Sequence, residues 1–425
     1  MKRIIQSVKG TREFYPKEMA FRNWLYRNIS QISIRYGYQE YDGPFLEQME
    51  LYAAKSGEEL VKEQSFVFPD RGGNMITLRP ELTPSLARMV AQKQHQLDYP
   101  LRWWSFGPFW RYEKPQKGRT REFFQWNIDL IGVNSPEADA ELVAICADFF
   151  RQVGLTQNEV KILVNDRRLM DEQLFKIGIS PDRKKEIFNL IDRHDKMPPH
   201  EWDSYALELG ITSEQLKKIK MMVSDTQIHK SSLEMTRFFT ALDALGVKEY
   251  VSYDARIVRG LDYYTGIVFE ARDIGENARA ILGGGHYDNL VEDVGGDPLP
   301  GVGFAMGDVV IGNILNDFDK MPEISQEPAC VMITIFDEKT KPDSLRIASI
   351  FRKAGINTIV YPEAVKLSRQ FKFASRMNLR FVVVIGPDEI QDQVIQIKDL
   401  TTGEQKIIKI NQAVDFIQLA RDERA

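Results

Sequence analysis

The clearest helical pattern lies near the amino end of the chain. In "MAFRNWLYRNISQISIRYGY" apolar residues recur every three or four positions, as they do on one face of an α-helix. These apolar residues are Phe21, Trp24, Leu25, Ile29 and Ile32. Gly37 follows them and predicts the carboxyl end of the helix, because glycine readily adopts the left-handed conformation that ends many helices. The next segment, "YQEYDGPFLE", predicts an extended chain that runs into a Gly-Pro turn.

Two aromatic segments predict a pair of consecutive strands. "LRWWSFGPFWRYE" (Leu101–Glu113) and "EFFQWNIDLIG" (Glu122–Gly132) are rich in aromatic and β-branched residues, and the eight residues "KPQKGRTR" join them. Just upstream, "NMITLRPELTPSLARMVAQ" predicts a strand, a turn and a helix with Thr83 near its start. The first region, residues 1–160, is therefore expected to mix helix and strand.

The pattern changes after residue 160. Segments such as "SPDRKKEIFNLIDRHDKM" and "SEQLKKIKMMV" are charged and helical, which predicts a helical insertion over residues 161–245. Strands resume near Tyr250 and continue through "ARAILGGGHYDNLV" and "GVGFAMGDVV". We therefore expect residues 246–322 to complete the fold that residues 1–160 begin.

A polar linker that contains proline, Asp319–Pro328, precedes a last region at 328–425. Its short apolar runs "ACVMITIF", "NTIVY", "RFVVVIG" and "QVIQIKD" predict strands, with helical segments between the first three. Continuously apolar strands that alternate with helices are typical of an α/β domain with a largely buried sheet.

Composition narrows the class of protein. The chain has 425 residues, of which 43% are hydrophobic and 28% charged, as in an ordinary globular protein of two or three domains. No apolar run is long enough to cross a membrane, no secretory signal is visible, and Cys146 and Cys330 stand far apart. We expect a cytoplasmic protein without disulfides or a structural zinc site. The net charge of −5 argues against a nucleic-acid coat but permits a local basic patch.

The hairpin around residue 115 carries candidate chemistry. Its loop "KPQKGRTR" is basic, and Arg111 lies at the end of the first strand, where a rigidly held guanidinium could bind a phosphate with two hydrogen bonds. A solvated basic hairpin is an equal alternative on this pattern alone. Gln125 and Asp129 share a strand face with apolar neighbours, which indicates either a lined cleft or the solvent side.

Three other segments offer ligand groups or close backbone approach. Glu81 and Thr83 could together hold an ammonium group, although helix capping by Thr83 is the commoner role for such a pattern. "RGLDYYTGIVFE" reads as a strand, yet its start gathers a cation, an acid and two phenols in Arg259, Asp262, Tyr263 and Tyr264. "GGGHYDNL" is rich in glycine, which lets backbone approach a ligand closely.

Together these segments resemble the histidyl-tRNA synthetases, a family of class II aminoacyl-tRNA synthetases, over essentially the full length. "KGTREFYP" resembles the family's opening segment, and "GYQEYDGPFLE" resembles the dimer-interface motif with its proline, Pro44. "LRPELT" and "FWRYEKPQKGRTREFFQ" resemble the histidine-binding strand and motif 2, and "RGLDYYTG" and "GGGHYDNL" resemble two motifs peculiar to histidine-specific enzymes. The resemblance implies an α+β fold, with an antiparallel sheet flanked by helices, a helical insertion and a C-terminal α/β anticodon-binding domain.

The resemblance also implies roles for individual residues. Arg111 and Arg259 would hold the α-phosphate of ATP as the catalytic cations, and Glu113 would orient the adenine side. Histidine would be bound by Glu81, Thr83, Gln125, Asp129, Tyr263 and Tyr264. The motif 2 loop residues Lys117, Arg119 and Arg121 would contact tRNA, as would a basic helix face in the last domain. Mg²⁺ would arrive with ATP and not in a site built from protein side chains.

The expected partners are therefore L-histidine, ATP, histidine tRNA and a second copy of the chain, with no membrane.

One segment departs from the family pattern. "GVGFAMGDVVIG" usually ends in Glu-Arg, and the arginine reaches the γ-phosphate of ATP; here those positions are Val309 and Val310, after Asp308. We expect Asp308 to cap the following helix. Either another basic residue or metal ions replace the missing arginine, or activity is lost. The missing arginine favours one alternative to an ATP-dependent ligase, the regulatory subunit of ATP phosphoribosyltransferase. An RNA-binding accessory protein is a further alternative.

Overall fold

The computed structural model describes residues 4–53, 64–114, 120–258, 263–275, 280–324 and 329–422. The chain divides into two compact units, Met1–Glu323 and Ile324–Ala425. Cys146 and Cys330 are both free thiols, and Cys146 is buried.

An eight-stranded sheet forms the centre of the first unit, in the order β1-β5-β6-β11-β10-β9-β7-β8. Its strands are β1 (Gln39–Glu40), β5 (Leu101–Trp110), β6 (Glu122–Ile131), β7 (Val160–Asp166), β8 (Val251–Tyr253), β9 (Ile267–Asp273), β10 (Ala280–Tyr287) and β11 (Gly301–Gly307). The five pairings from β5 to β7 are antiparallel, whereas each outermost strand, β1 and β8, pairs in parallel. A smaller sheet holds β2 (Leu46–Gln48), β4 (Met75–Leu78) and β3 (Phe66–Pro69) in that order.

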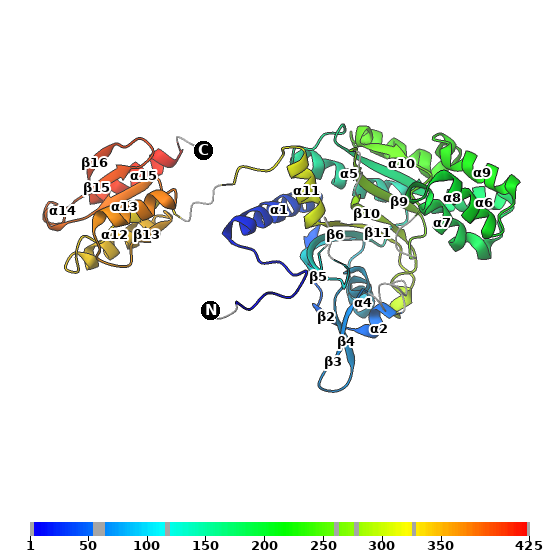
Figure 1. Cartoon of the computed structure of the whole chain (residues 1–425), viewed down its shortest axis with the longest axis horizontal. Coiled ribbons are helices and arrows are strands. Elements are labelled where there is room, and N and C mark those ends of the chain that lie inside the picture. Colours follow the sequence, from blue (N-terminus) through cyan, green and yellow to red (C-terminus); the bar gives the residue numbers. More distant parts are fainter. Residues whose placement is uncertain are drawn as a thin grey trace. The chain divides into compact units, whose positions relative to one another are not determined.

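Helices cover the two faces of the large sheet (Figure 1). On one side lie α1 (Pro16–Arg35), α5 (Pro136–Gln152) and α11 (Asp308–Asp317), and α10 (Leu233–Ala244) packs on α5. On the other side lie α4 (Thr83–Lys93) and α2 (Met49–Ala53). The predicted amino-terminal helix is confirmed: Leu25, Ile29 and Ile32 are fully buried, and Gly37 has the expected left-handed φ of +80°.

The helical insertion leaves the sheet after β7. It consists of α6 (Arg167–Ile177), α7 (Lys184–Asp192), α8 (Pro199–Glu208) and α9 (Ser213–Ser224), and α10 leads back to the sheet. The predicted start at residue 161 is therefore too early, because β7 pairs with β9 and β8 inside the large sheet. Buried Val160, Ile162 and Val164 alternate along β7, which is the period of a strand.

The second unit is the predicted α/β domain. Its sheet has the order β13-β12-β14-β15-β16, with parallel pairing of β12 to both β13 and β14. The strands are β12 (Val331–Ile333), β13 (Thr358–Val360), β14 (Phe381–Val384), β15 (Val394–Asp399) and β16 (Gln405–Lys409). The helices are α12 (Lys341–Lys353), α13 (Leu367–Arg376), α14 (Pro387–Gln391) and α15 (Ala413–Asp422). The first four strands coincide with the predicted apolar runs, and β16 was not predicted.

Candidate active site

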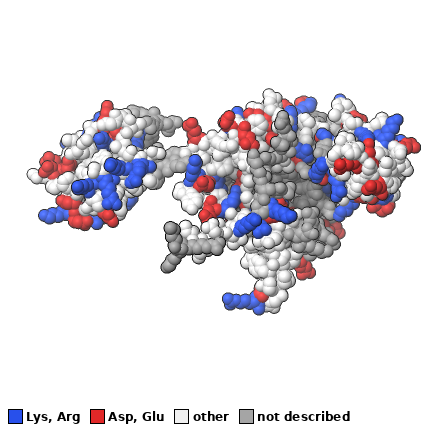
Figure 2. All heavy atoms as spheres, in the orientation of Figure 1, with Lys and Arg blue, Asp and Glu red and all other residues white. Residues whose placement is uncertain are grey.

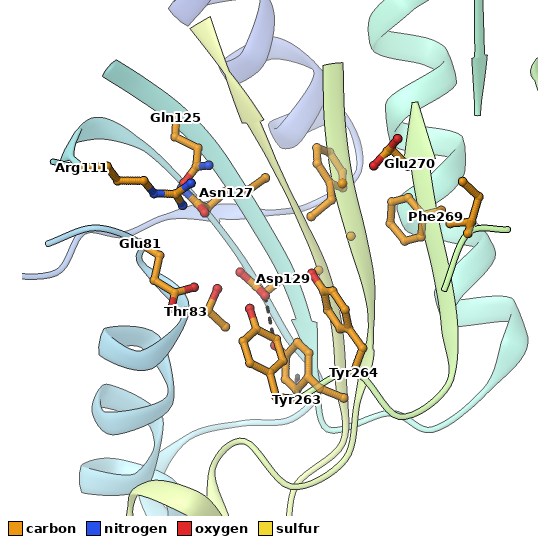
Figure 3. A pocket seen from close by; sticks show the side chains of 17 residues that line it. Glu81, Thr83, Arg111, Gln125, Asn127, Asp129, Tyr263, Tyr264, Phe269 and Glu270 are labelled. Carbon is orange, nitrogen blue, oxygen red and sulfur yellow. Dashed lines mark hydrogen bonds between the residues drawn. The ribbon is translucent and has the colours of Figure 1, made fainter. Parts of the chain in front are cut away.

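A cavity of about 280 Å³ lies between the start of α4 and the middle strands of the large sheet (Figure 3). Its walls come from the segment before α4, from β6, β9, β10 and β11, and from the residues that precede β9. Every described residue predicted to bind histidine lines this cavity: Glu81, Thr83, Gln125, Asp129, Tyr263 and Tyr264. Arg111 lines it as well, so segments far apart in the sequence meet at one place.

Strand β6 supplies one polar face to the cavity. Gln125, Asn127 and Asp129 alternate along it and line the cavity, whereas Trp126 and Ile128 are buried in the core with α5 on the opposite face. One face of β6 therefore lines the cavity and the other packs in the core, so Gln125 and Asp129 face a cleft and not the solvent side. Asn127 was missed, although it shares the strand parity of its two neighbours.

The neighbouring strand β11 makes room for this polar face. Gly303 pairs directly with Asp129, and Ala305 pairs with Asn127. A Cβ atom at Gly303 would lie 2.1 Å from the Oδ1 atom of Asp129 and 2.8 Å from the backbone oxygen of Ile128. The glycine is needed because the carboxylate occupies the space of its missing side chain.

Asp129 is the buried acid of the cavity. Only 4% of its surface is exposed, and its Oδ1 atom accepts a hydrogen bond of 3.0 Å from the Tyr287 hydroxyl. Burial raises the pKa of Asp129 to about 7, and the hydrogen bond from Tyr287 opposes that rise. The carboxyl group therefore changes its charge near neutral pH.

Three tyrosines surround Asp129. The ring centroids of Tyr263 and Tyr264 lie 5.0 Å apart, and those of Tyr263 and Tyr287 lie 6.0 Å apart with perpendicular planes. Burial raises the pKa of each of these phenols, so all three stay neutral and can donate hydrogen bonds at physiological pH.

Glu81 and Thr83 enter the cavity from the start of α4. Glu81 is 4% exposed, and Thr83 is the first residue of the helix. The N-cap is Leu82, and no side chain caps this end of α4. The helix-capping alternative for Thr83 is therefore wrong, which leaves its hydroxyl group beside Glu81 in the cavity (Figure 3).

A second cavity of about 270 Å³ adjoins the first. It is lined by Glu113, Thr120, Phe123, Val309, Val310 and nearby residues of β10 and β11. Five residues line both cavities, namely Arg111, Gln125, Glu270, Gly283 and Ala305. Arg111 follows β5 directly, donates from Nε to the backbone oxygen of Pro80 at 3.0 Å, and lies 5.3 Å from the ring centroid of Phe123. The guanidinium is thus anchored where the two cavities meet.

Asp308 does not cap α11 as predicted. The N-cap is Gly307, and Asp308 is the first helical residue. Its carboxylate accepts hydrogen bonds from Nη2 of Arg12 at 2.8 Å and from the backbone N–H of Phe124 at 2.9 Å. It therefore ties the amino-terminal segment and β6 to the helix start, and this partner 296 residues away was not predictable from local sequence.

Three of the remaining predicted site residues lie outside the described residues, namely Arg259, Lys117 and Arg119. Arg121 is described: its Nε donates to the backbone oxygen of Glu113 at 3.1 Å, and its guanidinium lies 4.1 Å from the ring centroid of Tyr112. Arg121 therefore braces the base of the motif 2 loop.

An antiparallel sheet that brings a buried acidic pocket and an arginine-lined cavity together, followed by a separate α/β unit, is the architecture that the resemblance to class II aminoacyl-tRNA synthetases implies. Comparison with known families narrows the class: a family model described as "Histidyl-tRNA synthetase" matches residues 10–308, and one described as "Anticodon binding domain" matches residues 329–419. The chain belongs to the histidyl-tRNA synthetase family.

Individual relatives are similar to this chain over nearly its whole length. The chain is 37% identical over 420 residues to the chloroplastic/mitochondrial histidine–tRNA ligase of Arabidopsis thaliana, covering 96% of this chain and 85% of that protein. It is 33% identical to the histidine–tRNA ligase of Leptospira biflexa, covering 97% of each chain. The crystal structure of histidyl-tRNA synthetase from Nostoc sp. PCC 7120 superposes with a TM-score of 0.80 at 26% identity, covering 99% of this chain and 100% of that one.

The activity follows from this membership: ATP-dependent attachment of histidine to histidine tRNA. The family assignment and the anticodon-binding domain favour the ligase over the regulatory-subunit and accessory-protein alternatives.

Proposed function

We propose that histidine binds in the first cavity, that ATP binds in the second, and that the two react beside Arg111. The observation that carries this proposal is that Arg111 lines both cavities. A cation at this boundary would contact the α-phosphate of ATP while the histidine carboxylate approaches it. Glu113 and Phe123, farther along the second cavity, are the candidates for the adenine side.

The first cavity suits histidine at both ends. Glu81 and Thr83 provide oxygen atoms for the α-ammonium group. Neutral imidazole has one N–H donor and one lone pair, which a carboxylate at Asp129 and a phenol at Tyr264 can satisfy. Gln125 and Tyr263 complete the wall. An apolar competitor would leave these buried polar groups unpaired, which is the most effective source of discrimination between amino acids.

Activation is a displacement at phosphorus. A carboxylate oxygen of histidine forms a bond to the α-phosphorus, the bond to the bridging oxygen breaks, and pyrophosphate leaves with the electron pair. Such a reaction depends mainly on positioning and on stabilising charge, which are the functions we assign to Arg111 and, from the sequence, to Arg259. In the second step, a terminal ribose hydroxyl of tRNA attacks the histidyl carbonyl and AMP leaves.

Magnesium is expected as the ion that accompanies ATP. Among the residues that the structure describes, no group of three or more His, Cys, Asp or Glu side chains could hold a metal ion. One carboxylate, that of Glu270, lines both cavities. Mg²⁺ commonly binds one or two carboxylates together with substrate phosphates, so Glu270 fits an ion that arrives with ATP, where the ion would neutralise phosphate charge.

The second unit is proposed to read the anticodon region. Along α13, Lys366, Arg369, Lys372 and Arg376 are exposed, while Gln370 and Ala374 are buried. Figure 2 shows basic side chains gathered over this unit. Such a face can follow an RNA backbone, and specific reading would require unstacked bases. Lys117, Arg119 and Arg121 in the motif 2 loop are proposed to meet the acceptor end.

We also propose a homodimer formed through the motif 1 segment. Phe45 and Leu46, which follow Pro44, are 46% and 49% exposed in the single chain, which leaves apolar surface for a second copy.

The location of the protein is a separate proposal. In the described part of the chain, no helix is long and apolar enough to cross a membrane. The cytoplasm is the proposed location.

Amino-acid-dependent exchange between ATP and pyrophosphate tests this proposal. With each amino acid supplied alone, histidine should support exchange, and charging of histidine tRNA should follow when tRNA is added. Exchange that is absent with histidine, or equal with another amino acid, would show that the first cavity has been misassigned.

A further inference from the structure

The junction between β7 and α6 binds the backbone on both sides of the segment that carries "RGLD". Asn165 Nδ2 donates to the backbone oxygen of Ala255 at 3.1 Å. Two residues later, the Arg167 guanidinium donates from Nη2 to the backbone oxygen of Val258 at 3.1 Å and from Nη1 to that of Tyr264 at 2.7 Å. One side chain thus joins two points that are six positions apart in the sequence.

Arg167 also contacts the histidine-pocket tyrosine and the insertion. Its guanidinium carbon lies 5.9 Å from the ring centroid of Tyr264 and 5.9 Å from that of Phe188 on α7. Its backbone N–H donates to Gly266 at 3.0 Å. Arg167 is 8% exposed, and it is the first residue of the helix that begins the insertion. The residue therefore lies between the helical insertion and the wall of the first cavity.

The surroundings make these hydrogen bonds important for the position of Tyr264. A cavity of about 700 Å³ lies on the insertion side, bordered by Arg167, Phe188, Val258 and Tyr264. Because open space adjoins this side of the backbone, packing alone does not fix it. A planar guanidinium can donate to two carbonyls at once, whereas a lysine ammonium is a point charge at the end of a flexible stem.

We propose that Arg167 is a positioning residue for histidine recognition: it fixes the backbone at Val258 and Tyr264 and so sets the tyrosine against the substrate from the insertion side. This inference rests on the proposed function, in which Tyr264 contacts the imidazole. Arg167 does not line the first cavity and acts on the substrate only through Tyr264.

The test is Arg167→Lys in the full-length chain, with Arg167→Gln as a second variant. The Michaelis constants for histidine and ATP are measured in pyrophosphate exchange, the histidine Kd is measured by calorimetry, and the unfolding midpoint is measured by heating. Arg352→Gln is the matched control, because Arg352 also donates two guanidinium hydrogen bonds to backbone, at the oxygen of Thr358, but in the other unit.

We expect the lysine variant to raise the histidine KM and Kd about tenfold, which corresponds to about 1.4 kcal/mol, with the ATP KM within about twofold. The control should leave all three constants unchanged. Unchanged histidine binding in both Arg167 variants would overturn the inference. So would a parallel loss of ATP and histidine binding, or failure of both variants to fold, because each would mark a purely structural residue. These outcomes differ from a failure of the proposed function itself, because in that case the unmodified chain would also lack histidine-dependent exchange between ATP and pyrophosphate.

Discussion

The Tyr287 hydroxyl donates a hydrogen bond of 3.0 Å to the Oδ1 atom of Asp129, a residue 158 positions away. This bond stabilises the charged form of a buried carboxylate whose pKa burial raises to about 7. In the proposed function, this pair sets the pH at which Asp129 becomes able to accept the imidazole N–H of histidine.

The first prediction concerns Tyr287→Phe. Loss of the hydrogen bond should raise the pKa of Asp129 further, so the rise of kcat/KM for histidine with pH should move to higher pH. At pH 7 we expect kcat/KM to fall about ten- to hundredfold, the effect of one hydrogen bond to a charged group. The measurement is a pH profile of pyrophosphate exchange from pH 6 to 9, and an unmoved profile would contradict the assignment of this ionisation to Asp129.

The second prediction concerns Asp129→Asn, which cannot ionise. An Asp with a raised pKa is protonated at low pH and becomes charged as the pH passes about 7, so histidine binding in the unmodified protein should strengthen through that range. The asparagine variant should bind histidine weakly at every pH and retain only the ionisation of histidine itself. Calorimetric titration with histidine at pH 6, 7 and 8 distinguishes the two profiles.

The third prediction concerns Gly303→Ala. The added methyl group would collide with the Asp129 carboxylate and with the Ile128 backbone oxygen, so the strand pair or the acid must shift. We expect a loss of about 1–3 kcal/mol in the free energy of unfolding, together with a large fall in histidine activation. Gly283→Ala on the neighbouring strand β10 is the stability control, because a Cβ atom there meets only the backbone oxygen of Phe269, at an ordinary contact distance of 4.0 Å. Equal stability of the two variants would argue against the tight contact.

The fourth prediction concerns Arg12→Ala. Burial raises the pKa of Asp308, and Arg12 lowers it, so removal of Arg12 leaves a buried carboxylate that is harder to ionise. In the unfolded chain this group ionises at its ordinary pKa, so the destabilisation should be small near pH 4 and grow with pH. At pH 7.5 we expect a loss of about 2 kcal/mol, measured by urea unfolding. A loss independent of pH would show that the ion pair is not its source.

The fifth prediction concerns the second unit. A chain that ends at residue 323 retains the whole first compact unit and both cavities. It should therefore activate histidine at a rate close to that of the full chain but charge tRNA poorly, because the basic face of α13 is gone. Equal aminoacylation by both forms would exclude the proposed anticodon role.

Local sequence patterns predicted much of this structure. The hairpin β5–β6, the helix α1 and the first four strands of the second unit follow from periodicity and composition, because the spacing of apolar residues within each element shows which of its faces is buried. Strand β7 was missed, since its short alternation of Val160, Ile162 and Val164 lies beside a charged helical region. Strand β16 was missed because it is an exposed edge strand with little alternation in burial.

The site was predictable only in part. Residues that a single strand aligns, such as Gln125 and Asp129, were found from parity, and the family motifs supplied Glu81 and Tyr264. The hydrogen bond from Tyr287 to Asp129 joins residues 158 positions apart, and the one from Arg12 to Asp308 joins residues 296 positions apart. No local sequence pattern encodes contacts over such separations. Glu270 and Arg167 were missed for a similar reason: the role proposed for Glu270 depends on how two cavities meet over the sheet, and that of Arg167 on how the insertion meets the sheet.

The most direct test of the central claim is the rate of histidyl-adenylate formation in a single turnover by Arg111→Ala, compared with the unmodified chain. If the two cavities meet at this guanidinium as proposed, the rate should fall by about 10²- to 10³-fold while the protein stays folded. A rate within a few-fold of that of the unmodified chain would contradict the assignment of Arg111 to the reacting phosphate.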